Sequence, residues 1–477
     1  MWPIMMIRTK IVATLGPATC QQDAIERLAR AGVDVFRINF SHGDNEQRKS
    51  LLNNIRAVEA KLQTPLAVMG DLCGPKIRVR RIDGGSVLLG EGQEIVIQRE
   101  DILGTAQRIS TTLEELPQQV RPGQPLLMDD GKIRLEVVET VSADEIICKV
   151  TQGGVLAGSK GVNLPGTQLQ ISALTEKDRS DAAWIATQDF DYVALSFVQV
   201  ASDVNELRQL LESSGCNARI VAKIERPQAL ANIDAIIDAA DAIMVARGDL
   251  GVEMDLPAVP AAQKRIARLC QIKGKPCIIA TQMLESMTVS PTPTRAEVSD
   301  VANAVLDLAD AVMLSGETAV GNHPVATVRM MDRIAAEMQS YDDQARTTDS
   351  VQVLRAPQTV ASLARAVQGI TDAQPIAAIA AFTITGNTAR ILSKQRPTCP
   401  ILGISPDPEV VRRMCLYYGV RSTQAGLVEH TADVLKLASE FAIELGLASA
   451  GDDIIVISGR PLGKTGVTNT LVVHTIG

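Results

Sequence analysis

Residues 219–249 read RIVAKIERPQALANIDAIIDAADAIMVARGD and contain two short apolar runs, RIVAKIER and AIMVARGD, with a helix-like stretch between them. Continuous apolar runs are typical of strands that are buried on both faces of a parallel sheet. Both runs end in charged residues. The segment therefore predicts a strand, a crossover helix and a second, parallel strand.

The same unit recurs along the chain. Eight apolar runs end in polar or glycine residues, and a helix-like stretch follows each of them: KIVATLGP (10–17), VFRINFSHG (35–43), PLAVMGDL (65–72), YVALSFV (192–198), RIVAKIER (219–226), AIMVARGD (242–249), CIIATQ (277–282) and AVMLSGET (311–318). Eight such units are the number that closes a (β/α)8 TIM barrel. An open, doubly wound sheet has a similar pattern, so the periodicity favours the barrel without deciding it.

The gap between the third and fourth runs is far longer than the others. Within residues 79–160, short alternating segments with turn signals, such as GGSVLLGEGQEIVIQ and MDDGKIRLEVVE, predict an inserted all-β domain that resembles a small barrel and acts as a lid. The polar stretch YDDQARTTDSVQ (341–352) predicts a linker. We therefore expect a catalytic barrel at 1–78 and 161–340 and an α/β regulatory domain at 341–477.

Composition limits the class of protein. The chain has 477 residues, which is more than one hydrophobic core usually organises. The net charge of −8 and the lack of Lys/Arg-rich blocks argue against a nucleic-acid partner. No apolar run approaches the roughly 18 to 20 residues of a membrane-spanning helix, and the N-terminal segment lacks the cleavage site of a signal peptide. We expect a cytoplasmic protein with no membrane contact and with reduced cysteines.

In a β/α barrel, reactive groups lie at the C-terminal ends of the strands. The second run ends with Arg37, Asn39 and Ser41, which alternate and therefore share one strand face. A guanidinium with two neutral oxygen donors suits an anion with a cation nearby. His42 follows directly, and a lone histidine in that position is as often structural as functional.

The fifth and sixth runs add charges of both signs. Lys223 and Glu225 alternate along one strand, and Gly248 and Asp249 precede an expected helix start, where exposed amides favour a bound carboxylate or phosphate. Glu225 and Asp249 together suit Mg²⁺ or Mn²⁺. A single such pair is usually a solvated surface pair, but charged residues end six successive buried runs. The last two runs end in Thr281, Ser315 and Glu317.

One further polar pattern has a structural explanation. Thr294 and Glu297 have the spacing of a helix capping box, in which both side chains bind free amides at a helix start. We therefore expect a helix to begin at this point rather than a reactive site.

Several longer segments closely resemble the signatures of pyruvate kinases, in that family's order: RINFSHG, DLCGPKIR, VAKIERPQAL, IMVARGDLGVE, ATQMLESM, PTRAEVSDVANAVLD and MLSGETA. The resemblance extends over essentially the whole chain. It implies the last step of glycolysis, in which the phosphoryl group of phosphoenolpyruvate moves to ADP and gives pyruvate and ATP. It also implies a requirement for Mg²⁺ or Mn²⁺, allosteric control and a homotetramer.

The resemblance assigns roles residue by residue. Arg37 and Lys223 would bind the phosphoryl group, and Lys223 would also stabilise the transition state. Glu225 and Asp249 would hold the divalent ion. The substrate carboxylate would meet the amides of Gly248 and Asp249 together with a hydroxyl group. That hydroxyl group belongs to Thr281. The enolate would be protonated in the region of Thr281, Ser315 and Glu317. The nucleotide contacts fall on Asn39, His42, Arg78 and Lys160.

A monovalent-ion site depends on one substitution. By resemblance, K⁺ would lie among oxygens of Asn39, Ser41, Asp71 and the Leu72 carbonyl, but Lys76 stands where K⁺-dependent relatives usually carry Glu. A fixed ammonium would supply the charge of the mobile ion. We therefore predict activity without K⁺. A surface ion pair of Lys76 at the lid hinge is the alternative.

The segment FTITGNTAR (382–390) resembles the family's effector-phosphate loop. Donors at the probable helix start come from Thr383, Thr385, Gly386 and Thr388. Asn387 replaces the Lys or Arg of many relatives, and Arg460 and Lys464 would compensate from across a cleft. This predicts activation by a phosphorylated sugar or nucleotide with one phosphate, and a weak response to fructose 1,6-bisphosphate.

Two other functions remain open from the residues alone. A pyruvate-forming aldolase or lyase would also hold a metal against an enolate, but it would not use nucleotide contacts or a lid. A non-enzymatic effector-binding relative would be expected to have lost Lys223, Glu225 or Asp249, and all three are present.

Overall fold

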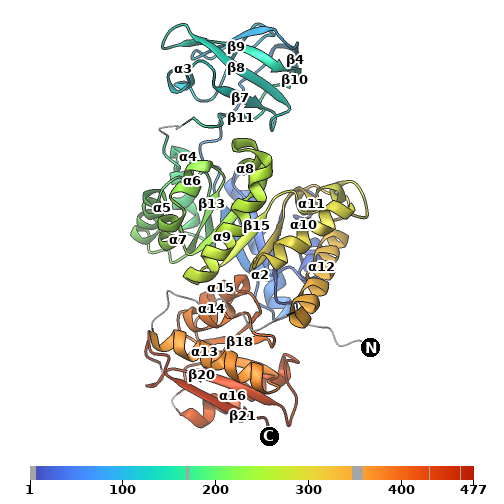
Figure 1. The fold of residues 1–477 in the computed structure, drawn as a ribbon. Coiled ribbons are helices and arrows are strands. Elements are labelled where there is room, and N and C mark those ends of the chain that lie inside the picture. The colour runs from blue at the N-terminus through green and yellow to red at the C-terminus, as the bar shows by residue number, and fades with distance from the viewer. Residues whose placement is uncertain (1–6, 168–170, 346–357, 429, 462) are drawn as a thin grey trace.

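A computed structural model describes residues 7–167, 171–345, 358–428, 430–461 and 463–477. Figure 1 shows three parts in a row, with a barrel in the middle, an inserted β-rich part at one end and the C-terminal part at the other. Among the described residues, no helix combines the length and the apolar character needed to cross a membrane.

The eight predicted strands form a closed barrel in which every neighbouring pair is parallel. The TIM barrel is therefore confirmed. The strands are β1 (Lys10–Thr14), β2 (Val35–Asn39), β3 (Ala67–Asp71), β12 (Tyr192–Leu195), β13 (Arg219–Ile224), β14 (Ala242–Ala246), β15 (Cys277–Ala280) and β16 (Ala311–Leu314). Nearly all of their residues are buried, because side chains on one face fill the barrel and those on the other pack under the helices.

Helices surround the barrel and turn their apolar sides toward it. The predicted capping box is confirmed: Thr294 Oγ1 accepts a hydrogen bond from the Glu297 amide at the start of α10, and the Glu297 carboxylate accepts one from the Thr294 amide. The helices of this part are α1 (Gln22–Arg30), α2 (Asn45–Leu62), α4 (Glu176–Ile185), α5 (Ala201–Ser213), α6 (Pro227–Ala231), α7 (Ile233–Ala239), α8 (Arg247–Glu253), α9 (Val259–Lys273), α10 (Arg295–Leu306), α11 (Gly316–Ala319) and α12 (Pro324–Ala345).

The last helix of the barrel part is longer than predicted. The polar stretch that begins at Tyr341 was expected to be a linker, but α12 continues to Ala345. The guanidinium of Arg8 donates hydrogen bonds to both oxygens of Asp343, at 2.5 and 2.6 Å, which holds the last turn of α12 against the N-terminal segment. Residues 346–352 of the predicted linker lie outside the described residues.

The inserted part forms a six-stranded and a two-stranded sheet, with one short helix. Its chain enters and leaves through two segments that pair with each other: the Val79 amide donates to the Lys160 carbonyl, and the Val162 amide donates to the Ile77 carbonyl, both at 2.9 Å. The elements are β4 (Ser86–Leu89), β5 (Glu94–Gln98), β6 (Arg108–Ser110), α3 (Leu116–Gln119), β7 (Pro125–Met128), β8 (Ile133–Thr140), β9 (Glu145–Gln152), β10 (Gly154–Ala157) and β11 (Val162–Asn163).

The C-terminal part is one five-stranded sheet in the order β19-β18-β17-β20-β21, with only the β20–β21 pair antiparallel. The apolar runs AIAAFTITG (378–386), PILGIS (400–405) and DIIVISG (453–459) predict β17, β18 and β20, whereas β19 and β21 were not predicted. The elements are α13 (Gln358–Ala373), β17 (Ala378–Phe382), α14 (Asn387–Ser393), β18 (Ile401–Ser405), α15 (Pro408–Arg413), β19 (Val420–Gln424), α16 (Thr431–Glu444), β20 (Asp453–Ser458) and β21 (Thr470–Thr475).

Candidate functional site

Lys223 is the centre of a buried polar cluster at the C-terminal ends of the barrel strands. Its Nζ lies 2.7 Å from Ser196 Oγ, 2.9 Å from Glu225 Oε1 and 3.3 Å from Asp71 Oδ1. Burial alone would lower the pKa of Lys223, but the carboxylates of Asp71 and Glu225 outweigh it and raise the pKa above its ordinary value. The ammonium therefore stays charged in a site that excludes most water.

Asp71 holds two cations at once. Its Oδ2 accepts a hydrogen bond from Arg37 Nε at 2.6 Å, and its Oδ1 faces Lys223. Burial opposes ionisation, but Arg37 and Lys223 together lower the pKa of Asp71 below its ordinary value. A second nitrogen of Arg37 donates to Thr14 Oγ1 at 2.9 Å, so the guanidinium is fixed on two sides.

Glu225 is almost completely buried, and both of its oxygens are engaged. Oε1 faces Lys223, and Oε2 accepts a hydrogen bond from the Phe197 amide at 2.7 Å. Burial and the nearby charge of Asp249 raise the pKa of Glu225, while Lys223 acts in the opposite direction. The two carboxylates repel each other in a buried site, and a divalent cation bound between them would remove that repulsion.

Glu225 and Asp249 suit a hard cation that also binds water and substrate oxygens. The part of the chain that the structure describes contains no group of three or more His, Cys, Asp or Glu that would hold a metal by itself. Mg²⁺ typically uses one or two carboxylates and completes its shell with water and substrate oxygens. Glu225 and Asp249 match that arrangement.

Phe197 and Thr281 are backbone outliers beside the cluster. Phe197 has φ of 56° and Thr281 has φ of 71°, a region that bulky and β-branched residues rarely occupy. The Phe197 conformation aims its amide at Glu225, and a Cβ on Gly74 would come within 2.7 Å of the Phe197 ring. Such strain persists where surrounding contacts fix it, often at functional sites.

The predicted anion donors on α8 contact a predicted hydroxyl. The Gly248 amide donates to Thr281 Oγ1 at 2.7 Å, and Thr281 Oγ1 donates to the Ala280 carbonyl at 2.6 Å. Asp249 lies in the first turn of the same helix. The ends of β14 and β15 are therefore in direct contact.

Glu317 lies in the first turn of α11, directly after the end of β16. It is fully buried, and its oxygens accept hydrogen bonds from the Ser315 amide at 2.7 Å and the Leu284 amide at 3.2 Å. Its carboxylate therefore fixes the loops that follow β15 and β16.

The predicted nucleotide residues divide into two groups. Asn39 and His42 lie at and after the end of β2, and Asn39 Oδ1 accepts a hydrogen bond from the Ser41 amide at 3.0 Å. Arg78 and Lys160 lie on the paired segments below the inserted sheets. Arg78 donates to the Ser159 carbonyl, and Lys160 Nζ lies 2.8 Å from Asp129 Oδ1.

Lys76 lies between the inserted part and α8. Its Nζ is 3.9 Å from Asp249 Oδ1, and both side chains are about one-third exposed, at 36% and 32%. The carbonyl of Leu72, one of the predicted monovalent-ion ligands, accepts a hydrogen bond from Ser196 Oγ at 2.8 Å.

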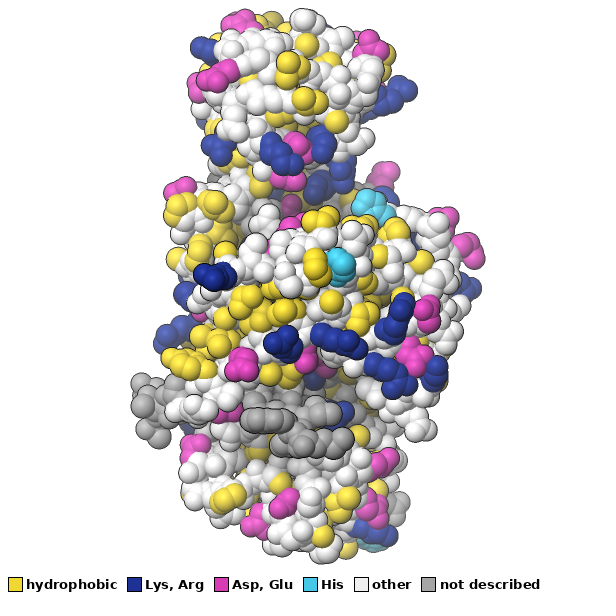
Figure 2. Space-filling model, turned by 90° about the vertical axis from the view of Figure 1, so that its right-hand side faces the viewer, with side chains coloured by type: hydrophobic (Ala, Val, Ile, Leu, Met, Phe, Trp, Pro, Cys, Tyr) yellow, Lys and Arg dark blue, Asp and Glu magenta, His cyan; other side chains and the backbone are white. Residues whose placement is uncertain are grey.

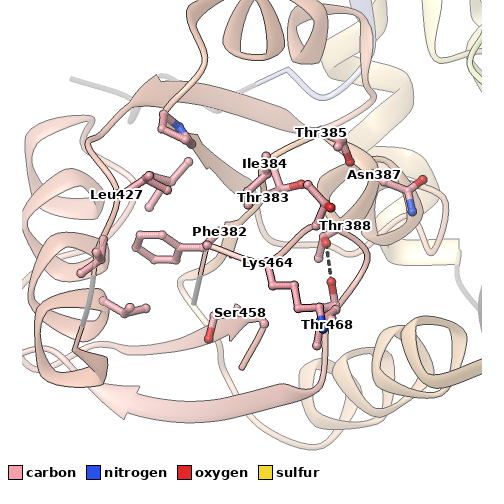
Figure 3. A pocket seen from close by; sticks show the side chains of 18 of the residues that line it. Phe382, Thr383, Ile384, Thr385, Asn387, Thr388, Leu427, Ser458, Lys464 and Thr468 are labelled. Carbon is pink, nitrogen blue, oxygen red and sulfur yellow. Dashed lines mark hydrogen bonds between the residues drawn. The ribbon is translucent and has the colours of Figure 1, made fainter. Parts of the chain in front are cut away.

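A separate cavity of about 110 Å³ lies in the C-terminal part (Figure 3). Gly386 precedes α14 with φ of 79°, a conformation that favours glycine. Thr388 Oγ1 lies 2.8 Å from Thr468 Oγ1, and Asn387 accepts a hydrogen bond from Arg390. Of the predicted effector residues, the cavity is lined by Thr383, Thr385, Asn387, Thr388 and Lys464.

Arg460, like Gly386, is not among the described residues that line this cavity. Its backbone forms two hydrogen bonds with the Asn469 side chain, both of 2.8 Å.

Sequence analysis missed Ser196, Phe197 and Thr14. Ser196 and Phe197 lie near the end of the fourth predicted run, so their position at the site follows because reactive groups lie at the C-terminal ends of barrel strands. Their roles depend on the contact of β12 with β13, which no local pattern reveals.

Residues 6–328 match the family model "Pyruvate kinase, barrel domain". The chain belongs to the pyruvate kinase family. Residues 361–474 match a second model of this family, "Pyruvate kinase, alpha/beta domain". The family predicted from sequence is thus confirmed, and so is its phosphotransferase activity from phosphoenolpyruvate to ADP.

Curated pyruvate kinases match over almost the whole chain. The protein from Geobacillus stearothermophilus is 42% identical over 99% of this chain and 81% of its own length. The protein from Corynebacterium efficiens is 40% identical over 98% of both chains. A crystal structure of a pyruvate kinase from Cryptosporidium parvum has a TM-score of 0.90 and 34% identity, and the match covers 98% of this chain and 96% of that one.

Proposed function

We propose that Arg37 and Lys223 bind the phosphoryl group of phosphoenolpyruvate, and that Lys223 also stabilises the charge of the transition state. The observation that carries this proposal is the Lys223 ammonium, which is buried and held by Ser196, Asp71 and Glu225. Phosphoryl transfer depends mainly on positioning and on cations that are already in place. A cation fixed by three oxygens needs no reorganisation during the reaction.

Glu225 and Asp249 would hold Mg²⁺ or Mn²⁺. The bound ion would neutralise charge on the transferring group and orient it. This proposal is supported by the raised pKa of Glu225, whose causes are burial and the proximity of Asp249.

The substrate carboxylate would meet the amides of Gly248 and Asp249 and the hydroxyl of Thr281. The hydrogen bond between the Gly248 amide and Thr281 Oγ1 keeps these donors together. The enolate that remains after transfer would be protonated near Thr281 and Ser315. Glu317 would act by positioning, because its oxygens bind the Ser315 and Leu284 amides.

The nucleotide would bind between the barrel and the inserted lid. Asn39 and His42 would contact it from the end of β2, and Arg78 and Lys160 from the neck of the lid. Figure 2 shows Lys and Arg side chains gathered where the inserted part meets the barrel, which favours a phosphate-bearing ligand there. Closure of the lid would exclude water that competes for the phosphoryl group.

The K⁺ requirement would be replaced by Lys76. Its ammonium is near Asp249, and so near the proposed phosphoryl site, where Asn39, Ser41, Asp71 and the Leu72 carbonyl would otherwise suggest a potassium site.

The cavity of Figure 3 would bind an activating sugar phosphate or nucleotide with one phosphate. Hydroxyls of Thr383, Thr385 and Thr388 and the ammonium of Lys464 support a single phosphate, while Asn387 adds no charge. Gly386 would add a backbone amide, and Arg460 would have to move to contribute. Strong activation by fructose 1,6-bisphosphate at micromolar levels would contradict this specificity.

We further propose a cytoplasmic homotetramer with domain limits at 1–78 and 161–340, 79–160, and 341–477. Large apolar side chains that are strongly exposed in one chain include Leu256, Val289 and Val320. Figure 2 shows apolar side chains gathered on one flank of the barrel, and such surfaces mark interfaces.

Steady-state turnover tests the residue roles and the cofactors together. ATP formation would be measured in a coupled assay with phosphoenolpyruvate, ADP and Mg²⁺, with and without K⁺ and with a panel of sugar phosphates. Loss of all turnover when Mg²⁺ is omitted, and no loss when K⁺ is omitted, is the expected result. Pyruvate release without ATP formation would instead favour a lyase-type reaction.

A further inference from the structure

A second polar cavity, of about 280 Å³, lies between the barrel and the C-terminal part. The barrel lines it with Arg208 on α5, with Cys216 in the loop before β13 and with Arg219 at the start of β13. The C-terminal part lines it with Thr385 and with Arg413 on α15. Thr385 also lines the effector cavity, so the two cavities lie on opposite sides of one loop.

Two arginines on the barrel side of this cavity depend on one carboxylate. Arg208 lies 2.9 Å from Asp241, and Arg219 lies a longer 3.7 Å from it. Arg219 therefore has the weaker ion pair and keeps donors for a ligand in the cavity that it lines.

Arg413 lines the cavity from the C-terminal part, and its side chain is only 7% exposed. One terminal nitrogen donates to Glu409 at 2.6 Å. Its Nε has no hydrogen-bond partner among the described residues, but this atom has almost no accessible surface, so a ligand in the cavity would meet the rest of the guanidinium. Two carboxylates also line the cavity: Asp407 caps α15 through the Glu409 amide, and Glu212 lies exposed on α5.

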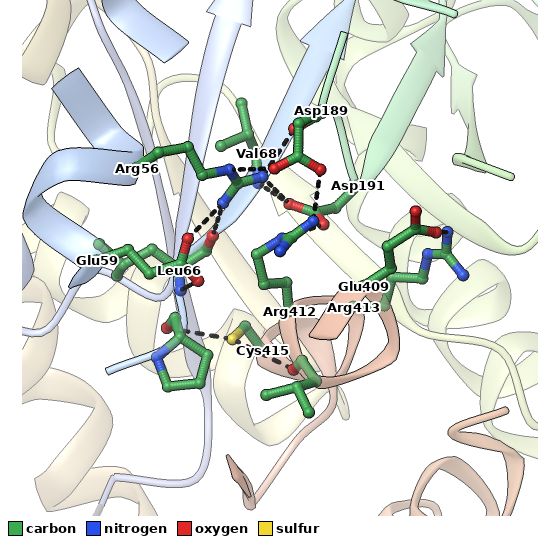
Figure 4. Close-up of polar contacts among 12 residues, drawn as sticks. Arg56, Glu59, Leu66, Val68, Asp189, Asp191, Glu409, Arg412, Arg413 and Cys415 are labelled. Carbon is green, nitrogen blue, oxygen red and sulfur yellow. Dashed lines mark hydrogen bonds and ion pairs between the residues drawn. The ribbon is translucent and has the colours of Figure 1, made fainter. Parts of the chain in front are cut away.

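The helix that carries Arg413 is fastened to the barrel. Its neighbour Arg412 contacts Asp191 at 2.8 Å and Asp189 at 2.5 Å, as Figure 4 shows. Asp191 also accepts a hydrogen bond from the Val68 amide, at the start of the strand that ends in Asp71. A ligand on Arg413 would thus act on the contact between α15 and the catalytic barrel.

We propose that this cavity binds inorganic phosphate or a small phosphomonoester, held by Arg208, Arg219 and Arg413. Planar guanidinium groups from several directions suit the tetrahedral oxygens of a phosphate group. The site is distinct from the effector cavity, and it does not depend on the roles proposed for the catalytic residues.

The half-buried thiol of Cys216 reports on occupancy, because it lines the cavity. The rate of its alkylation by neutral iodoacetamide would be followed by peptide mass spectrometry in the full-length protein, with phosphate or glycerol 3-phosphate replacing chloride at constant ionic strength. At about ten times its dissociation constant, a ligand that covers the thiol should slow the reaction about tenfold. Cys20, which is also half-buried and lies near the start of α1, is the internal control and should react at an unchanged rate.

Two variants separate this site from the effector cavity. Arg219→Gln, whose native side chain is partly exposed and therefore tolerant of change, should abolish the protection of Cys216. Lys464→Gln, which alters the effector cavity only, should retain it. If phosphate alone protects the Cys216 thiol, the ligand is the free anion. If both probes protect it, the cavity is a phosphomonoester site. No protection by either probe, equal protection in Arg219→Gln, or loss of protection in Lys464→Gln would overturn the proposal.

Discussion

Lys223 illustrates how a single side chain is fixed by its neighbours. Two carboxylates and one hydroxyl surround its ammonium, and one of those carboxylates also binds Arg37. Taking either cation away would leave Asp71 buried with less compensation, which is costly. The cluster is therefore a unit whose members keep one another charged and in place.

We expect Lys223→Met to fold and bind Mg²⁺ but to lose turnover. One preorganised charged contact in a dry site is typically worth about 10² to 10³ in rate, so kcat should fall by at least that factor with a smaller change in KM for phosphoenolpyruvate. The coupled assay measures both. Lys61→Met is the control, because Lys61 is exposed on α2 and, among the described residues, forms its ion pair with Glu26. Near-normal turnover of Lys223→Met would remove Lys223 from the mechanism.

Lys76→Glu should convert the enzyme from K⁺ independence to K⁺ dependence. The substitution removes a tethered positive charge and adds an anion near Asp249, which a monovalent cation must then offset. Turnover of both proteins would be compared in tetramethylammonium buffers, with K⁺ added at constant ionic strength. A many-fold stimulation of the unmodified enzyme by K⁺ would contradict the idea.

Among the elements, the barrel strands were predictable because both of their faces are buried, so each reads as a continuous apolar run. Strand β19, VRSTQ, was missed because it is a short edge strand with polar alternation. The last turn of α12 was missed because its support, the Arg8–Asp343 pair, joins residues far apart in sequence. Ser196 was missed for the same reason, since its partner Lys223 lies on the next strand. Local patterns reveal elements and strand ends, whereas partners across strands require the fold.

Asp332 on α12 gives a prediction about pH. Burial and the charge of Asp34 raise the pKa of Asp332 from 3.8 to about 6. The folded protein therefore holds this proton more tightly than the unfolded chain, so the stability that it contributes is fully present below about pH 4 and is lost as pH rises to about 6.

Asp332→Asn should remove this loss. The free energy of unfolding of Asp332→Asn should exceed that of the unmodified protein by a small amount near pH 4. This difference should grow up to about pH 6 and then stay constant. Its upper limit is about 3 kcal/mol, because each pKa unit corresponds to about 1.4 kcal/mol and solvent screening lowers the contribution of a partly exposed group. Urea unfolding at several pH values measures it. The exposed Asp23→Asn is the control and should show no such trend. A pH-independent difference for Asp332→Asn would refute the assignment.

In the whole molecule, the barrel and the C-terminal part share one apolar cluster and are also joined by ion pairs, but they do not share a sheet. Arg412 reaches Asp189 and Asp191, and Lys394 forms a fully buried pair with Asp310 at the base of the barrel. Buried pairs contribute little net stability but enforce one geometry. They are the connections through which the C-terminal cavities would influence the strands of the catalytic site.

Arg412→Gln should weaken this influence without removing catalysis. We expect kcat at saturating phosphoenolpyruvate to change little. A sugar monophosphate should shift the phosphoenolpyruvate concentration that gives half-maximal rate, and we expect this shift to become several-fold smaller in the variant. Titrations with and without glucose 6-phosphate measure the shift. Arg421→Gln is the matched control, because the hydrogen bond that Arg421 donates within the described chain goes to the Leu445 carbonyl of its own part. An unchanged shift in Arg412→Gln would show that coupling takes another path.

The paired neck of the inserted part also has a consequence for synthesis on the ribosome. The barrel closes by pairing β1 with β16, so it cannot be completed until the residues near Ala311 have emerged. The inserted sheets need nothing beyond β11 and can form much earlier. Once they do, the hydrogen bonds between Ile77 and Val162 bring the chain after β3 back to the chain before β12. Joining β3 to β12 then costs less conformational entropy than the number of intervening residues implies, because a folded domain has replaced a long flexible segment.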